Sequence, residues 1–207
     1  MSKIVSEFRK EVGRPNSDCF IYIRILQHIG DPKYADIIEK LKGPLYKYYE
    51  QKNRFRDYFD KLAFKDLLEY SKKLKELMLE KKVGNCKEMN EIVQYEHLNK
   101  GVETHKIHLS IFDKDTCMEI KDHCFLLRGL PKEADLTDPK TWGEAILVDS
   151  WAGSGIVDQA VRPKGLVKKG ALDEVLKYLM FNPEKEEVRF LSNNSEHAEN
   201  FINNMKK

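Results

Sequence analysis

Three residues of the chain, Cys86, His123 and Asp149, have the side chains of a thiol-dependent acyl-transfer site. In such a site a cysteine thiolate attacks a carbonyl carbon, an imidazole moves the proton, and a carboxylate holds the imidazole in one tautomer. Cys86 follows Gly84-Asn85, at a point where the sequence passes from a loop into a helix. A helix N-terminus lowers the pKa of a thiol, and its N–H groups can stabilise an oxyanion. We therefore predict that Cys86 is the nucleophile and that Asn85 contacts the substrate.

His123 and Asp149 lie at the ends of two apolar runs, residues 123–127 and 145–149, which are typical of buried strands. If the runs pair antiparallel with His123 facing Asp149, every remaining pair matches apolar with apolar. Directly opposed side chains share a face, with Cβ atoms about 4.5–5.5 Å apart. This register predicts a hydrogen bond between the imidazole and the carboxylate, although the 17 residues between the runs leave the register unforced.

The elements before this site are predicted to be helical. Residues 20–26 form a buried segment for which we favour a helix over a strand, and Gly43-Pro44 should end a short helix that begins at Tyr34. Apolar residues at three- and four-residue steps predict one long amphipathic helix over 54–82. A further helix over 88–98 should end at Gly101 in a left-handed cap.

After Gly101 the apolar period changes from that of a helix to two, which indicates strands. Strands are predicted over 106–111, 118–127, 145–148 and 188–191, and helices over 171–180 and 195–204, with Ser195 as an N-cap. Helices followed by an antiparallel sheet give an α+β fold class. We expect one compact unit, in which a helical region (1–82) packs on a catalytic core (83–207).

The order of these motifs resembles that of the papain-like and transglutaminase-like cysteine enzymes, most closely their compact bacterial effector forms. The matching segments are Gly84-Asn85-Cys86, residues 122–127, and Leu147-Val148-Asp149-Ser150-Trp151. The resemblance implies a papain-like core in which Cys86 is the nucleophile, His123 the general base and acid, and Asp149 the orienting residue. It also implies a protein substrate, and the effector forms it resembles act on proteins of a host cell.

The chain departs from that pattern in two places. Ser150 stands where transglutaminases often have proline, and no oxyanion glutamine is evident upstream of the cysteine, where Gln27 and Asn85 are the candidates. Trp151 is either a core aromatic residue or a wall that shields the His–Asp pair and binds substrate.

The composition of the chain argues against several classes of protein. The 36 Lys and Arg residues nearly balance 34 Asp and Glu residues, so no nucleic-acid footprint is indicated. No apolar run is long enough to span a membrane, and the first residues lack the apolar region of a signal peptide. Four cysteines in 207 residues are too sparse for a disulfide framework. We expect a cytoplasmic protein with reduced thiols, or one delivered without a signal peptide into a host cytosol.

Other sites are weaker candidates. Cys19 is the rival nucleophile, but the apolar run after it suggests burial. Five residues with metal-ligating side chains match no zinc-ligand spacing, so we expect neither metal nor cofactor: His105, His108, Cys117, His123 and Cys124. Gly153-Ser154-Gly155 lacks the rest of a phosphate-binding motif and should be a loop.

The favoured function is therefore cysteine-dependent acyl transfer on a protein substrate, as a glutamine deamidase or transglutaminase rather than a protease. The alternatives are a non-catalytic protein-interaction module on the same fold, and a thiol amidase or acetyltransferase acting on a small molecule.

Overall fold

The structure is a computed structural model that describes residues 31–59, 61–81, 84–150 and 166–205. Its first elements are helical: a 3-10 turn η1 (Pro32–Tyr34), then α3 (Ala35–Phe59), α4 (Leu67–Lys81) and α5 (Cys86–Leu98). The second half contains the strands and shorter helices, namely β1 (Thr104–Asp113), β2 (Glu119–Arg128), η2 (Pro139–Thr141), β3 (Ile146–Asp149), β4 (Leu166–Lys169), α7 (Leu172–Tyr178), β5 (Glu186–Ser192) and α8 (Glu196–Met205). The predicted α+β class, with helices first and strands after them, is confirmed.

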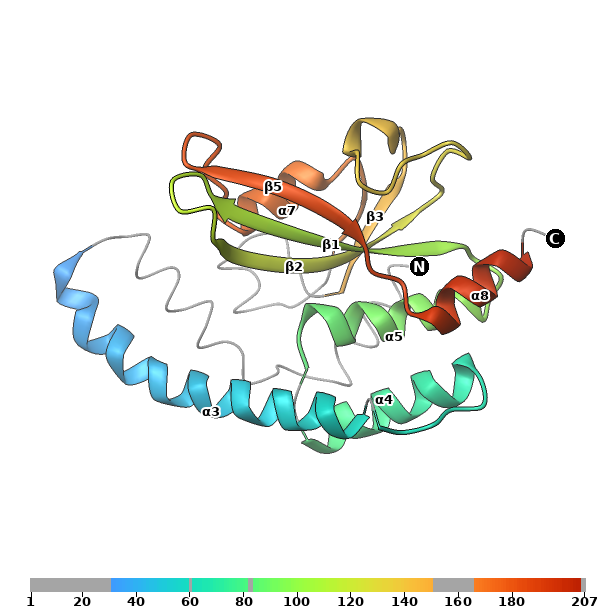
Figure 1. Cartoon of the computed structure of the whole chain (residues 1–207), viewed down its shortest axis with the longest axis horizontal. Coiled ribbons are helices and arrows are strands. Elements are labelled where there is room, and N and C mark those ends of the chain that lie inside the picture. Colours follow the sequence, from blue (N-terminus) through green and yellow to red (C-terminus); the bar gives the residue numbers. More distant parts are fainter. Residues whose placement is uncertain (1–30, 60, 82–83, 151–165, 206–207) are drawn as a thin grey trace.

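The strands form one sheet in the order β4-β3-β2-β1-β5, and every neighbouring pair is antiparallel. Helix α5 lies between this sheet and the pair α3 and α4, while α7 lies on the other side of the sheet (Figure 1). Alternation along β2 separates two cores. Cys124 and Leu126 pack toward α5, α4 and α3, whereas Phe125 and Leu127 pack toward Trp142 and α7.

Two helix boundaries differ from the prediction. Helix α3 continues through Gly43-Pro44 instead of ending there. Pro44 removes one donor from the helix ladder, but both residues are exposed, so water can satisfy the carbonyl that loses its partner.

The amphipathic pattern over 54–82 is likewise not one helix, because α3 ends at Phe59 and α4 begins at Leu67. Asp66 accepts a hydrogen bond from the Glu69 N–H at 2.8 Å, and the Glu69 carboxylate accepts one from the Lys65 N–H at 2.8 Å. This capping arrangement starts a new helix within the apolar stripe. Strand β4 was not predicted, and residues 20–26 lie outside the described part of the chain.

The predicted register of β2 and β3 is wrong by two residues. Leu126 is opposite Val148 and Leu127 is opposite Leu147, so His123 does not face Asp149 directly. A two-residue shift leaves every side chain on its original face, whereas a one-residue shift would reverse the faces; the observed register pairs two leucines with apolar residues but sets Arg128 opposite Ile146. Hydrophobic patterning therefore predicted the faces of these strands correctly, but the register with the most apolar pairs is not the one that forms.

Candidate functional site

The N-terminus of α5 is held in place by a capping box. The Asn85 side-chain oxygen accepts from the Lys87 N–H at 3.0 Å, and the Glu88 carboxylate accepts from the Asn85 N–H at 3.0 Å. Arg56 of α3 donates to Glu88 at 2.6 Å and to the same Asn85 oxygen at 3.3 Å. The predicted helix start at Cys86 is confirmed. The Asn85 oxygen has a role in fixing the helix end that the sequence did not reveal.

Cys86, the first residue of α5, and Cys124 of β2 belong to the same buried cluster, where each thiol shifts the pKa of the other. Both are free cysteines in the buried cluster between α5 and the sheet, with exposed fractions of 6% and 2%. Contrary to the prediction, the pKa of Cys86 is raised rather than lowered. Its hydrogen bond to Cys124 and its burial both favour the neutral thiol.

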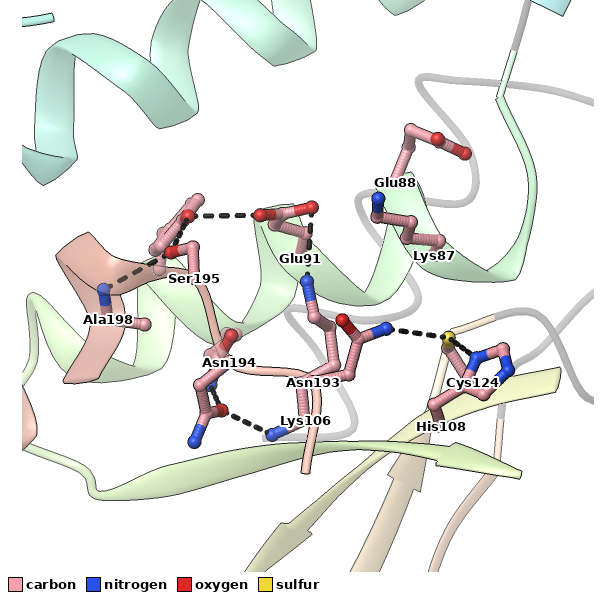
Figure 2. Close-up of polar contacts among 12 residues, drawn as sticks. Lys87, Glu88, Glu91, Lys106, His108, Cys124, Asn193, Asn194, Ser195 and Ala198 are labelled. Carbon is pink, nitrogen blue, oxygen red and sulfur yellow. Dashed lines mark hydrogen bonds and ion pairs between the residues drawn. The ribbon is translucent and has the colours of Figure 1, made fainter. Parts of the chain in front are cut away.

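Cys124 has the opposite electrostatic environment. His108 of β1 is its cross-strand partner, and the Nδ1 atom of His108 lies 3.4 Å from the Cys124 sulfur (Figure 2). Asn193, just after β5, donates to the same sulfur from Nδ2 at 3.6 Å. The hydrogen bond from Cys86, together with His108, lowers the pKa of Cys124 to about 5 despite burial. Its negative charge in turn raises the pKa of His108. These groups favour a thiolate–imidazolium pair at Cys124 and His108.

A second imidazole–carboxylate pair lies next to this cluster. The Nε2 atom of His123 is 2.6 Å from Asp149 Oδ2, and both side chains are buried. Burial opposes the charged imidazole, but the charge and hydrogen bond of Asp149, together with the negative charges of Cys124 and Asp122, outweigh it and raise the pKa of His123. Asp149 also accepts from Asn90 Nδ2 at 3.2 Å. The structure thus brings His123 and Asp149 together even though their strand register differs from the one predicted.

Asn90 connects the two parts of the site. Its amide nitrogen also donates to the Cys124 backbone carbonyl at 2.7 Å, and its oxygen accepts from the Ser150 N–H at 2.8 Å and the Ser150 hydroxyl at 2.9 Å. One buried side chain of α5 therefore fixes the backbone of β2 at Cys124 and the end of β3 at Asp149. Because Asn90 is one helical turn from Cys86, it also fixes the helix relative to both strands.

Cys86 and His123 are not joined by a hydrogen bond in the described part of the chain. Adjacent residues of a strand face opposite sides, and Cys124 is the residue that faces Cys86. His123 lies on the other face of β2, with its ring 6.0 Å from that of Tyr178 at the end of α7. The structure therefore brings His123 and Asp149 together as predicted. Cys86 lies apart from this pair and next to Cys124, whose imidazole neighbour is His108.

A buried ion pair fastens α5 to β1 beside the thiols. Lys106 Nζ lies 3.2 Å from the Glu91 carboxylate, with both side chains at most 5% exposed. The hydroxyls of Tyr70 and Tyr95 donate to the other carboxylate oxygen at 3.1 Å. Figure 2 shows Lys106 rising from β1 to Glu91, two residues before His108 on the same strand face. The position of His108 relative to α5 thus depends partly on this pair.

The remaining predicted residues fall outside the described ranges: Trp151, the rival Cys19, the oxyanion candidate Gln27 and the segment 153–155. Sequence reasoning overlooked Asn90 and Asn193, and it considered His108 and Cys124 as site residues only in the rejected set of metal ligands. The alternation of residues 106–111 could have placed His108 on the strand face opposite that of Ile107 and Leu109. No sequence pattern, however, predicts that this face contacts Cys124.

No family model, curated protein or solved structure matches the chain. Among the described helices, none has both the length and the hydropathy needed to cross a membrane.

Proposed function

We propose that this protein is a cysteine-dependent acyl-transfer enzyme acting on a protein substrate, with Cys124 as nucleophile and His108 as general base and acid. The observation that carries the proposal is the 3.4 Å contact between His108 Nδ1 and the Cys124 sulfur. A thiol pairs with an imidazole in this way where proton transfer between them activates the sulfur. The site residues therefore differ from the triad of Cys86, His123 and Asp149 inferred from the sequence.

The first half of the reaction forms a thioester. The Cys124 thiolate attacks the carbonyl carbon of a glutamine carboxamide, and the new S–C bond leaves a negative charge on the oxygen. The His108 imidazolium then gives its proton to the departing nitrogen as the C–N bond breaks, releasing ammonia. The Asn193 amide, which donates toward the sulfur at 3.6 Å, supports the anionic form before attack.

The second half resolves the thioester. Neutral His108 takes a proton from water, which converts the glutamine to glutamate, or from a primary amine, which cross-links two chains. Glutamine-directed chemistry remains our preference over proteolysis because of the short chain and the Asp-Ser-Trp sequence at 149–151. A papain-like or transglutaminase-like core and a role as a bacterial effector belong to this proposal. These two parts of the proposal are supported by the order of elements, in which a cysteine at the start of helix α5 precedes strands β2 and β3.

Cys86 and the His123–Asp149 pair have supporting roles in this proposal. The Cys86 thiol donates to the Cys124 sulfur and so stabilises its thiolate. Asp149 and Asn90 fix the end of β3 and the backbone carbonyl of Cys124. Both groups are positioning residues, which act through Cys124 and do not contact the reacting carbonyl.

One observation favours a second candidate, the non-catalytic interaction module. Cys124 is only 2% exposed, so a substrate reaches its sulfur only if neighbouring side chains move. In a module the buried thiols would serve as small apolar core residues and would take no part in acyl transfer.

The test is ammonia release from denatured casein and from a eukaryotic cell lysate, with and without a fluorescent primary amine. Wild-type protein should release ammonia or incorporate the amine. Cys124→Ser and His108→Gln should each lower the rate by at least roughly 100-fold, the usual scale for a general base. Cys117→Ser, which changes an exposed cysteine outside the cluster, is the matched control and should retain full activity.

The outcomes separate the candidates. Loss of activity in Cys86→Ser with retention in Cys124→Ser would assign the nucleophile to Cys86. Loss in His123→Gln with retention in His108→Gln would assign the base to His123. No turnover of either substrate by the wild type would favour the interaction module.

A further inference from the structure

We propose that Cys86 and Cys124 form a reversible disulfide when the protein meets a peroxide, which makes this pair an oxidation site. The two thiols come from different elements, the start of α5 and the middle of β2, and both are free in the reduced protein. Both side chains belong to the one buried cluster between α5 and the sheet and interact with each other there, and a disulfide requires them to approach until the S–S bond length is about 2.05 Å.

The groups around the two cysteines differ, and they assign one cysteine to react with the peroxide and the other to form the disulfide with it. Peroxide reacts with a thiolate, and Cys124 has three groups that stabilise negative charge on its sulfur: the Cys86 thiol, His108 and Asn193. At Cys86 the groups that favour the neutral thiol prevail, namely the Cys124 sulfur, burial, and the carboxylates of Asp122 and Asp149. Cys124 is therefore the residue oxidised first, and Cys86 is the resolving residue beside it.

The chemistry balances in two steps. The Cys124 thiolate attacks the peroxide, an S–O bond forms, the O–O bond breaks, and hydroxide leaves, so the sulfur is oxidised to sulfenic acid and the peroxide is reduced. Cys86 then attacks that sulfur, an S–S bond forms, the S–O bond breaks, and the oxygen leaves as water with the proton of Cys86. In sum, two thiols and one peroxide give one disulfide and two waters.

This inference does not depend on acyl transfer, because oxidation needs only the two thiols, their electrostatic environment, and a movement of neighbouring side chains that admits a peroxide to the Cys124 sulfur. The disulfide would close a loop from residue 86 to residue 124 and so restrict the unfolded chain. Loop closure of that length should raise the melting temperature of the oxidised protein by roughly 5–10 °C for a chain of this size.

The experiment treats the full-length reduced protein with stoichiometric hydrogen peroxide and maps the products by non-reducing peptide mass spectrometry. A Cys86–Cys124 cross-linked peptide should appear, disappear on addition of dithiothreitol, and accompany the rise in melting temperature. Cys86→Ser should stop at a Cys124 sulfenic acid that dimedone traps, and Cys124→Ser should leave Cys86 reduced. His108→Gln should slow the oxidation of Cys124 by roughly tenfold or more, because it removes the imidazolium beside the sulfur.

Cys117 provides the internal control, since it is exposed and lies outside the cluster. Its oxidation should be slower than that of Cys124, and Cys117→Ser should form the cross-link normally. The inference is overturned if Cys124 oxidises no faster than Cys117, or if disulfides join Cys124 to Cys117 or Cys19 instead of Cys86. Circular dichroism and melting of each reduced variant distinguish a failure to fold from a failure to oxidise. A cross-link in a protein without ammonia release would uphold this inference while contradicting the proposed function.

Discussion

The buried ion pair between Lys106 and Glu91 is predicted to be a main tie between α5 and the sheet, and Lys106→Met tests this. Methionine keeps an unbranched apolar side chain but removes the charge that faces Glu91 at 3.2 Å. Breaking a buried ion pair by removing one partner typically costs 3–5 kcal/mol, because the other charge stays buried without compensation. Two tyrosine hydroxyls continue to donate to Glu91, so we expect the lower end of that range, about 3 kcal/mol.

Equilibrium unfolding in urea measures this loss. With a denaturant slope of about 2 kcal/mol per molar, a loss of about 3 kcal/mol lowers the midpoint by roughly 1.5 M. The double variant Lys106→Met/Glu91→Gln should recover most of the loss, because a neutral amide can still accept from both tyrosines. Lys168→Met is the matched control, since it breaks an exposed ion pair with Glu174 and should cost less than about 1 kcal/mol.

The reasoning is refuted if Lys106→Met costs less than about 1 kcal/mol, or if the double variant is as unstable as the single one. The first result would mean that the pair is solvated in solution. The second would mean that the loss comes from packing rather than from the unpaired carboxylate.

Three further predictions concern the start of α5 and the end of the chain. Burial alone would raise the pKa of Glu88, but Arg56 and the Asn85 N–H lower this pKa below its ordinary value of 4.5. The charged carboxylate therefore stabilises the fold above pH 4.5, and this contribution is lost as the pH falls through the lowered pKa. Glu88→Gln should therefore cost about 2 kcal/mol in urea unfolding at pH 7, and this cost should shrink as the pH falls through the lowered pKa of Glu88; an equal cost at pH 7 and at about pH 2 would contradict the assignment. Gly84→Ala should lower the free energy of unfolding by about 1–3 kcal/mol, because φ at Gly84 is +153° and alanine is strained there. The alanine Cβ would also meet the terminal methyl of Met78, but that methyl can move aside. Adding Met78→Ala to the Gly84→Ala variant should therefore not restore its stability. Ser195→Ala should cost about 0.5–2 kcal/mol in thermal unfolding, because Ser195 accepts from the Ala198 N–H and contacts the Tyr95 hydroxyl; no change in melting temperature would argue against the cap.

Local signals in the sequence predicted most of the secondary structure correctly. The left-handed cap at Gly101, the start of α5 at Cys86 and the cap of α8 at Ser195 are all confirmed. Each depends on a few neighbouring residues whose backbone chemistry is the same in any fold. Similarly, the break before α4 was readable in principle, because Asp66 and Glu69 have the spacing of a capping box.

The site depends on information that local patterns do not contain. Whether His123 or Cys124 faces α5 is decided by which face of β2 the helix covers, and alternation leaves both choices open. Apolar matching also gave the wrong register for β2 and β3, since the register that forms sets Arg128 opposite Ile146 and has fewer apolar pairs than the predicted one. His108 meets Cys124 only because β1 and β2 pair at that position, a contact between residues 16 apart in sequence.

The central claim is that Cys124 is a thiolate held by His108 at neutral pH, and ultraviolet absorbance of the thiolate during a pH titration tests it without requiring access to the buried sulfur. The account predicts thiolate absorbance at pH 7 that disappears in Cys124→Ser, persists in Cys117→Ser, and titrates well below the ordinary thiol pKa of 9.0. It also predicts that His108→Gln shifts this titration to higher pH. Absorbance that develops only near pH 9, or that is lost in Cys86→Ser but retained in Cys124→Ser, would contradict it.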